Sequence, residues 1–104
     1  MASGKLGSAA LTANTNTTMY TCPNDKTATV NVNMVNRGST SALVRLSIGA
    51  ATPNNADYIE YDAEIPPNGV LERSGLVMSA AEVLVARAST ADVSVRAFGF
   101  EEVT

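Results

Sequence analysis

The sequence predicts an all-β protein that folds as a single antiparallel β-sandwich of about seven or eight short strands. Apolar and polar residues alternate over Ala28–Asn36, as in a strand that buries one face. Turns rich in Pro, Asn, Asp and Gly recur at intervals of roughly 8–12 residues. Helix-forming windows are nearly absent from Met19–Gly49. Local patterns do not encode strand pairing, so the immunoglobulin-like and jelly-roll strand orders both stay open.

The first part of the chain divides into an N-terminal segment and the start of the sandwich. Residues Met1–Thr12 are small and are predicted to form either a flexible arm or a first edge strand. The β-sandwich domain is expected over residues 13–104. Its first strand is predicted at Thr17–Cys22 and ends at the turn Pro23–Lys26, because Pro fixes φ and Asn and Asp tolerate turn conformations.

Two strands follow in the middle of the chain. Ala28–Asn36 is the clearest, and Asn36–Ser39 supplies the next turn. The alternation then continues through Ala42–Ile48, where Ser47 is expected to face outward. The side chains expected to face inward are Ala28, Val30, Val32 and Met34 in the first strand and Val44, Leu46 and Ile48 in the second.

The second half repeats the same pattern after an exposed loop at Gly49–Ala56. The strand Tyr58–Ile65 is expected to place Ile59, Tyr61, Ala63 and Ile65 on one face. A strong break at Pro66–Gly69 ends it. The remaining predicted strands are Val70–Met78, Glu82–Ala88 and Asp92–Glu101.

Composition limits the possible functions. The chain has 104 residues, a net charge of −3, no histidine and one cysteine, Cys22, which is expected to be a small buried residue. The arginines are scattered along an acidic chain and do not form the basic surface that binds nucleic-acid phosphates, so no nucleic-acid partner is predicted. Without histidine, Ser–His and Cys–His nucleophiles are excluded, and we predict no enzyme activity and no cofactor. No segment approaches the ~20 apolar residues of a membrane-spanning helix, so no membrane partner is predicted.

Acidic residues gather in and before one predicted strand, at Asp57, Glu60, Asp62 and Glu64. Calcium requires several oxygens at about 2.3–2.6 Å from one point. An extended strand with a rise of about 3.3 Å per residue separates Glu60 from Glu64 by about 13 Å. We therefore predict no metal site, with Asp57, Glu60 and Asp62 as weak candidates, and prefer a face that is solvated or paired with arginines. The arginines within alternating segments are Arg45, Arg73, Arg87 and Arg96.

Five apolar or aromatic residues are candidates for contacts with partner proteins: Leu6, Leu11, Tyr58, Phe98 and Phe100. Phe98 and Phe100 flank a single glycine and therefore project from the same face of the last strand. Core packing or a subunit contact is preferred for them over a platform that stacks on a ligand, because the chain has no accompanying basic groove.

Residues 17–49, TTMYTCPNDKTATVNVNMVNRGSTSALVRLSIG, resemble small structural proteins of tailed bacteriophages. The resemblance extends from about Leu11 to Glu102, and its second half lies in Ala56–Glu60, Ile65–Glu72, Leu76–Val83 and Val95–Glu101. The chain departs from the pattern at Cys22, where an aliphatic residue is commoner, and at the turn Asn24–Asp25, where a small residue and Gly are more familiar. The resemblance implies a β-sandwich and supplies no catalytic residues.

The resemblance implies a non-enzymatic phage virion protein that is assembled in the host cytoplasm. The leading hypothesis is a capsid decoration (cement) protein that binds the outer capsid surface and stabilises joints between major capsid subunits. Its expected partners are the major capsid protein or other virion proteins, together with copies of itself in a homo-oligomer such as a trimer. The alternative is a receptor- or glycan-binding module of a tail fibre or baseplate, for which exposed aromatic residues would be required.

Overall fold

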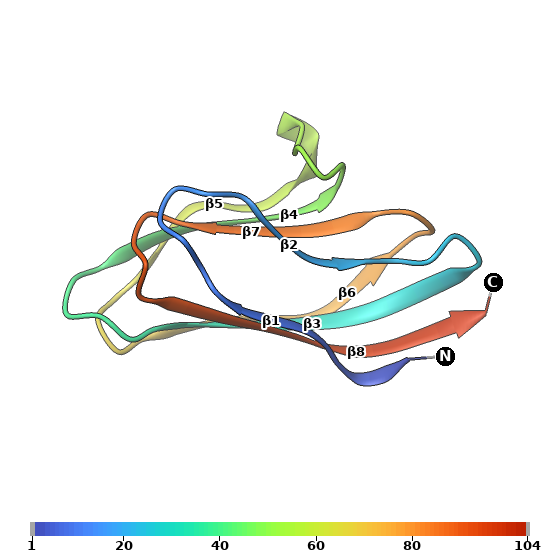
Figure 1. The fold of residues 1–104 in the computed structure, drawn as a ribbon, viewed down its shortest axis with the longest axis horizontal. Helices are drawn as coiled ribbons and strands as arrows, with labels where there is room; N and C mark the ends of the chain where they lie inside the picture. The colour runs from blue at the N-terminus through green and yellow to red at the C-terminus, as the bar shows by residue number, and fades with distance from the viewer. Residues whose placement is uncertain (1, 104) are drawn as a thin grey trace.

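The computed structural model describes residues 2–103 and contains two antiparallel four-stranded sheets packed face to face (Figure 1). The strands are β1 (Ser3–Ala10), β2 (Thr17–Thr21), β3 (Lys26–Asn36), β4 (Ala42–Gly49), β5 (Tyr58–Ile65), β6 (Val70–Met78), β7 (Val83–Ala88) and β8 (Val93–Val103). A single 3-10 turn, η1 (Asn55–Asp57), precedes β5 and projects beyond the second sheet. The predicted all-β sandwich is confirmed.

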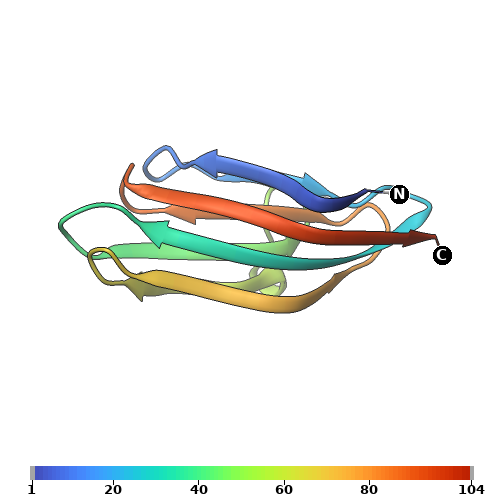
Figure 2. The same ribbon diagram turned by 90° about the horizontal axis from the view of Figure 1, so that it is seen from below.

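The strand order is that of a jelly roll. The first sheet has the order β1-β8-β3-β6 and the second sheet the order β2-β7-β4-β5. The four strands of the first sheet lie side by side in Figure 2. The pairs β4–β5, β3–β6, β2–β7 and β1–β8 form a nested set, as in a long ribbon folded back on itself. The immunoglobulin-like alternative has seven or more strands in a different order and does not apply.

The core lies between the two sheets and is aliphatic. Alternate residues of β3 and β8 point into it, because successive side chains of a strand point to opposite faces. The inward residues of β3, predicted from the alternation, are all buried: Ala28, Val30, Val32 and Met34. Val44 and Leu46 of β4 are also buried as predicted, and Ile48 packs against the core from its margin.

Every edge strand carries a bulge, whereas the inner pairs do not. The register shifts in β1 and β6 of the first sheet and in β2 and β5 of the second sheet. The pairs β3–β8 and β4–β7 run without a shift. Bulges twist an edge and leave its backbone groups poorly aligned for another strand. The four edges are therefore poor templates for strand addition.

The bulges in β5 correct two expectations from the alternation. Tyr61 was expected on the same face as Ala63 and Ile65, which pack at the core, yet it is 58% exposed. The register shift places an additional β5 residue opposite Arg45, and Asp62 adopts a positive φ of 53°, so the alternation is reversed at Tyr61. Ser47, expected to face solvent, is buried, and it lies opposite Val85 and Tyr58 of the neighbouring strands.

The N-terminal segment is part of the sandwich. Of the two alternatives for Met1–Thr12, the structure contains the edge strand: β1 pairs with β8 from Ser3 to Ala10. Met1 itself lies outside the described residues. Leu6 packs against the core, and Leu11 is buried within it. The interface role considered for Leu11 is therefore corrected to a core role.

One buried polar side chain joins two loops at the same end of the sandwich. Asn36, at the end of β3, is fully buried. Its Nδ2 lies 2.8 Å from the Thr40 carbonyl oxygen, 3.0 Å from that of Ile65 and 3.3 Å from that of Pro66. Its Oδ1 accepts a hydrogen bond of 2.9 Å from the Gly38 amide. This side chain therefore ties the β3–β4 loop to the β5–β6 turn.

Candidate functional site

The bulge in β5 builds a polar cluster on the outer face of the second sheet. Arg45 donates through Nε to Asp62 Oδ1 at 2.7 Å and through Nη2 to Asp62 Oδ2 at 3.3 Å. The Arg45 guanidinium also lies 4.2 Å from the centroid of the Tyr61 ring, a cation–π contact. Tyr58 meets Tyr61 edge-on at 4.9 Å between ring centroids. The guanidinium of Arg45 is therefore held on two sides.

The pairing with Arg45 also fixes the charge of Asp62. The hydrogen bond from Arg45 lowers the pKa of the Asp62 carboxyl below its usual value, partial desolvation opposes it, and the charges of Arg45 and Arg87 add to the lowering. The carboxylate thus stays ionised at neutral pH and balances one of the two arginines.

The three weak metal candidates do not converge. Asp62 pairs with Arg45, whereas Glu60 pairs with Arg73 of β6 at 3.2 Å and links the edges of the two sheets. Asp57 accepts hydrogen bonds from the amides of Ala50 at 3.2 Å and Asn54 at 3.0 Å within the β4–β5 loop. Within residues 2–103, no group of three or more Cys, His, Asp or Glu side chains is arranged to hold a metal ion.

A small pocket of about 180 Å³ adjoins the Arg45–Asp62 pair on the outer face of the second sheet. Four segments form it: the β1–β2 loop, β4, β5, and the end of β7 with the loop that follows. The lining residues are Asn14, Leu43, Arg45, Asp62, Arg87 and Ser89. Ser89 is held in place because its Oγ accepts a hydrogen bond of 2.9 Å from the Leu43 amide.

An apolar patch lies on the outer face of the first sheet. It comprises Phe98 (38% exposed), Phe100 (45% exposed) and Val77 (64% exposed), and is called the aromatic patch below. Phe100 of β8 and Val77 of β6 flank the same β3 residue, Thr29, so the patch crosses three adjacent strands. Phe98 and Phe100 thus lie on the outside of the sandwich, and the alternative of core packing is corrected.

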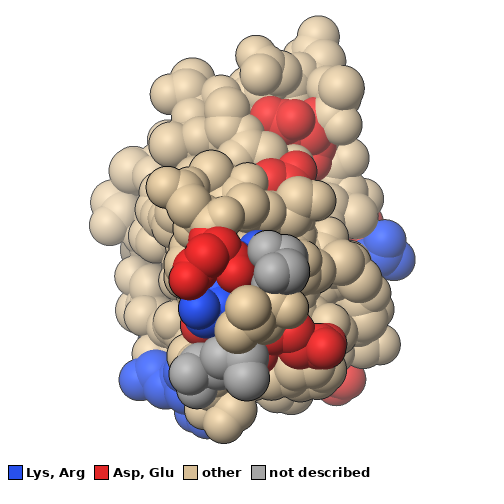
Figure 3. All heavy atoms as spheres, turned by 90° about the vertical axis from the view of Figure 1, so that its right-hand side faces the viewer, with Lys and Arg blue, Asp and Glu red and all other residues tan. Residues whose placement is uncertain are grey.

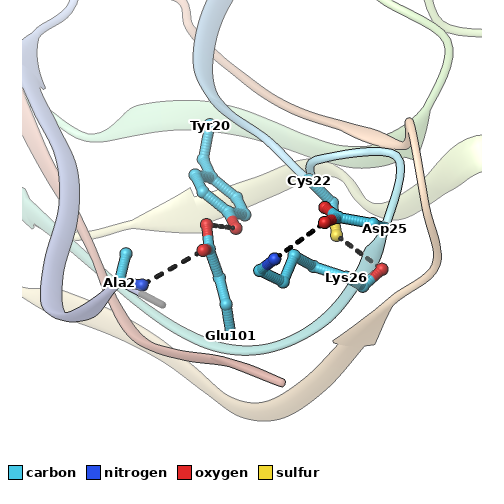
Figure 4. Close-up of polar contacts among 6 residues, drawn as sticks. All are labelled: Ala2, Tyr20, Cys22, Asp25, Lys26 and Glu101. Carbon is cyan, nitrogen blue, oxygen red and sulfur yellow. Dashed lines mark hydrogen bonds and ion pairs between the residues drawn. The ribbon is translucent and has the colours of Figure 1, made fainter. Parts of the chain in front are cut away.

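The end of the sandwich near both chain termini is closed by a hydrogen-bonded pair. Tyr20 of β2 donates its hydroxyl hydrogen to Glu101 of β8 at 2.5 Å, which joins the two sheets (Figure 4). Glu101 also accepts from the Ala2 amide at 3.1 Å. Figure 3, which looks at this end, shows acidic and basic side chains intermingled on a largely uncharged surface.

These contacts shift the pKa values of Tyr20 and Glu101 in opposite directions. Burial and the hydrogen bond to Glu101 raise the pKa of Tyr20, while the hydrogen bonds from Tyr20 and Ala2 lower the pKa of Glu101. A carboxyl whose pKa is lowered on folding stabilises the fold above its unfolded-chain pKa of about 4.3. This stabilisation is lost as the pH falls through the lower pKa of the folded chain.

We expect Glu101→Gln to lower Tm by a few degrees at pH 7, with a difference from wild type that shrinks as the pH is lowered below about 4. Thermal melting between pH 2 and pH 8 measures it. The matched control is Glu102→Gln, because the side chain of Glu102 is exposed and makes no hydrogen bond or ion pair with the described residues. An equal effect of both variants at all pH values would contradict the prediction.

The single cysteine is a buried structural residue. Cys22 is 1% exposed, and its Sγ lies 3.4 Å from the Lys26 carbonyl oxygen in the turn that follows (Figure 4). Burial is the largest cause of its raised pKa, which disfavours the reactive thiolate. The prediction of a small buried residue is confirmed.

Comparisons of the chain with protein-family models, with curated proteins and with solved structures find no match. The part of the chain that the structure describes contains no helix long and apolar enough to cross a bilayer.

The structure defines a jelly-roll domain with two features on opposite outer faces: the aromatic patch on the first sheet and the polar pocket on the second. The pocket is not predictable from the sequence, because Asn14, Arg87 and Ser89 come together only through contacts between distant segments.

Proposed function

We propose that this chain is a non-enzymatic structural protein of a bacteriophage virion, a decoration protein that binds the outer capsid surface and stabilises joints between major capsid subunits. The observation that carries the proposal is the aromatic patch. The resemblance of residues from about Leu11 to Glu102 to small phage structural proteins supports it. The jelly roll is compatible with this role but does not by itself imply a function, because the fold also serves lectins and cupins.

The patch has the composition of the centre of a protein interface. Phenylalanine is enriched at such centres and charged residues are depleted. Phe98 and Phe100 project beside the polar side chains of Asn31 and Thr29 on β3, which lie opposite them in the register. Burial of exposed aromatic surface against a capsid subunit would supply affinity, and the polar neighbours would help to set the orientation of the partner.

The bulges at the sheet edges favour contacts of partner proteins with the outer faces of the two sheets. An edge that carries a bulge pairs poorly with an added strand, so partners meet the sandwich through its outer faces in this proposal. The same reasoning applies to self-association: a trimer of this protein would join faces or loops and would not form a continuous sheet between subunits.

Copy number tests the proposal most directly. Quantitative mass spectrometry of purified virions of the phage that encodes this chain compares its amount with that of the major capsid protein. A ratio near one, or a simple fraction such as one third, is the expected result for a protein that follows the capsid lattice. Absence from the particle would overturn the assignment to the virion.

The aromatic patch itself is tested by the double variant Phe98→Ser/Phe100→Ser in a capsid-binding assay. We expect particle binding to weaken by about tenfold or more, because buried aromatic anchors dominate interface energetics. The control is Val103→Ser, since Val103 is 66% exposed at the end of β8 and lies outside the patch. Unchanged binding by the double variant, with an unchanged melting temperature, would exclude the patch as the contact surface.

A receptor- or glycan-binding module of a tail fibre or baseplate is the second candidate. The exposed ring of Tyr61, beside Tyr58 and close to the polar pocket, favours it, because sugar and peptide receptors use aromatic rings next to hydrogen-bonding groups. A copy number between a few and a few dozen per particle would place the protein in the tail and support this candidate instead.

A further inference from the structure

The pocket on the second sheet contains an unusual pair of charges. Arg45 of β4 and Arg87 of β7 lie directly opposite each other in the register. Like charges in directly opposite positions destabilise a sheet. Asp62 compensates Arg45 through two hydrogen bonds, whereas the side chain of Arg87 makes no salt bridge or hydrogen bond with any residue from 2 to 103. The two arginines and one carboxylate leave the pocket with one excess positive charge.

The surroundings of Arg87 provide further polar groups. The side chains of Asn14 and Ser89 line the same pocket and carry hydrogen-bond donors. The chain at Asn14 is held in place, because its amide donates to the Ala88 carbonyl oxygen at 2.8 Å. Leu43 contributes an apolar wall. Convergent polar groups next to an apolar wall are typical of small ligand sites.

Size and charge narrow the ligand class. The volume of about 180 Å³ is below the range of about 300–1,000 Å³ for drug-sized ligands, so the pocket fits a single functional group or one side chain. A guanidinium binds a carboxylate through two parallel N–H···O bonds. One excess positive charge matches a monoanion, whereas a phosphate monoester carries about −1.5 to −2 charges at neutral pH and would be repelled by Asp62.

We propose that this pocket is a binding site for one carboxylate group, with Arg87 as the main ligand-binding residue and Arg45 as a second positive charge held in place by Asp62 and Tyr61. The carboxylate comes from an acidic side chain of a partner protein or from a small carboxylic acid. The site lies on the second sheet, away from the aromatic patch, and the inference does not depend on the proposed role in the capsid.

The test is a titration followed by NMR of the arginine Nε–Hε signals at pH 7 and constant ionic strength. The probes are acetate, the capped peptide acetyl-Gly-Glu-Gly-amide and inorganic phosphate. A saturable shift of the Arg87 signal with acetate or the peptide is expected, with no such shift for Arg96 on the first sheet. Tighter binding of the peptide than of acetate identifies a protein side chain as the source of the carboxylate, and equal binding identifies a small acid.

Variants locate the site. Arg87→Gln is expected to weaken binding by about tenfold or more, because it removes a hydrogen-bonded charge from the pocket. It should keep a melting temperature at least as high as that of wild type, because a like-charge pair is removed. Arg96→Gln makes the same charge change on the other sheet and is expected to leave the affinity unchanged. No saturable shift at Arg87, an equal loss of affinity in both variants, or phosphate binding tighter than that of acetate would overturn the proposal.

Discussion

Asn36→Ala is expected to lower the free energy of unfolding by about 3–5 kcal/mol, a large part of the total for a domain of this size. The Asn36 side chain reaches both the β3–β4 loop and the β5–β6 turn, and the substitution removes these contacts. The Ile65 carbonyl oxygen loses a buried donor, and the Gly38 amide loses its acceptor. Buried polar groups without a partner cost about 1–3 kcal/mol each. Urea denaturation of the variant and of wild type measures the loss.

The matched control for this prediction is Asn33→Ala. Asn33 lies on the same strand, is partly exposed and makes no hydrogen bond from its side chain to the described residues, so a change below about 0.5 kcal/mol is expected. Asn36→Asp provides a second check, because it keeps the acceptor for Gly38 but points a carboxylate at three carbonyl oxygens. Its destabilisation should diminish as acid protonates that carboxyl. Equal losses for Asn36→Ala and Asn33→Ala would refute the role of the side chain.

Leu46→Ala is expected to cost about 2–5 kcal/mol, because the core would lose buried methyl groups and retain a cavity. Leu46 is 0% exposed on β4, an inner strand, and its cross-strand partner Ala86 is too small to fill the space. For a domain of this length each kcal/mol corresponds to about 4–8 °C in Tm. Calorimetry should therefore show a fall in Tm of about 8–40 °C.

Leu43→Ala is the control for the core substitution. Leu43 lies three residues earlier on the same strand and is 44% exposed, so the same chemical change should cost less than about 1 kcal/mol. If both leucine variants lost the same stability, the burial pattern of β4 would be wrong.

Much of the fold follows from local chemistry. The strands β5 and β6 begin and end where the sequence predicts, because the turn Pro66–Gly69 has fixed geometry: Asn68 adopts a φ of 60° and the Gly69 amide donates to the Pro66 carbonyl oxygen at 2.8 Å. The alternation in β3 likewise predicts its buried residues, since β3 pairs with β8 without a bulge.

The remaining features depend on contacts between distant segments. No local pattern reveals that β1 pairs with β8, which decides between an arm and an edge strand for residues 1–12. The bulge opposite Arg45 is also invisible in the sequence, and it brings Tyr61 and Asp62 to the same guanidinium. The sequence predicts that acidic residues pair with arginines, but it does not predict which residues pair. The pocket beside Arg87 was not predictable, because it depends on contacts between distant segments.

The nested pairing of strands also determines the order in which the protein can fold. Among the strands of residues 2–103, only β4 and β5 are both paired and adjacent in the chain; each further pair, β3–β6, β2–β7 and β1–β8, encloses the one before it. Each enclosing pair closes a longer loop at a higher entropic cost unless the inner pairs have formed. During synthesis, β1 therefore has no partner within the first sheet until β8 has been made, and the first sheet cannot be completed before then.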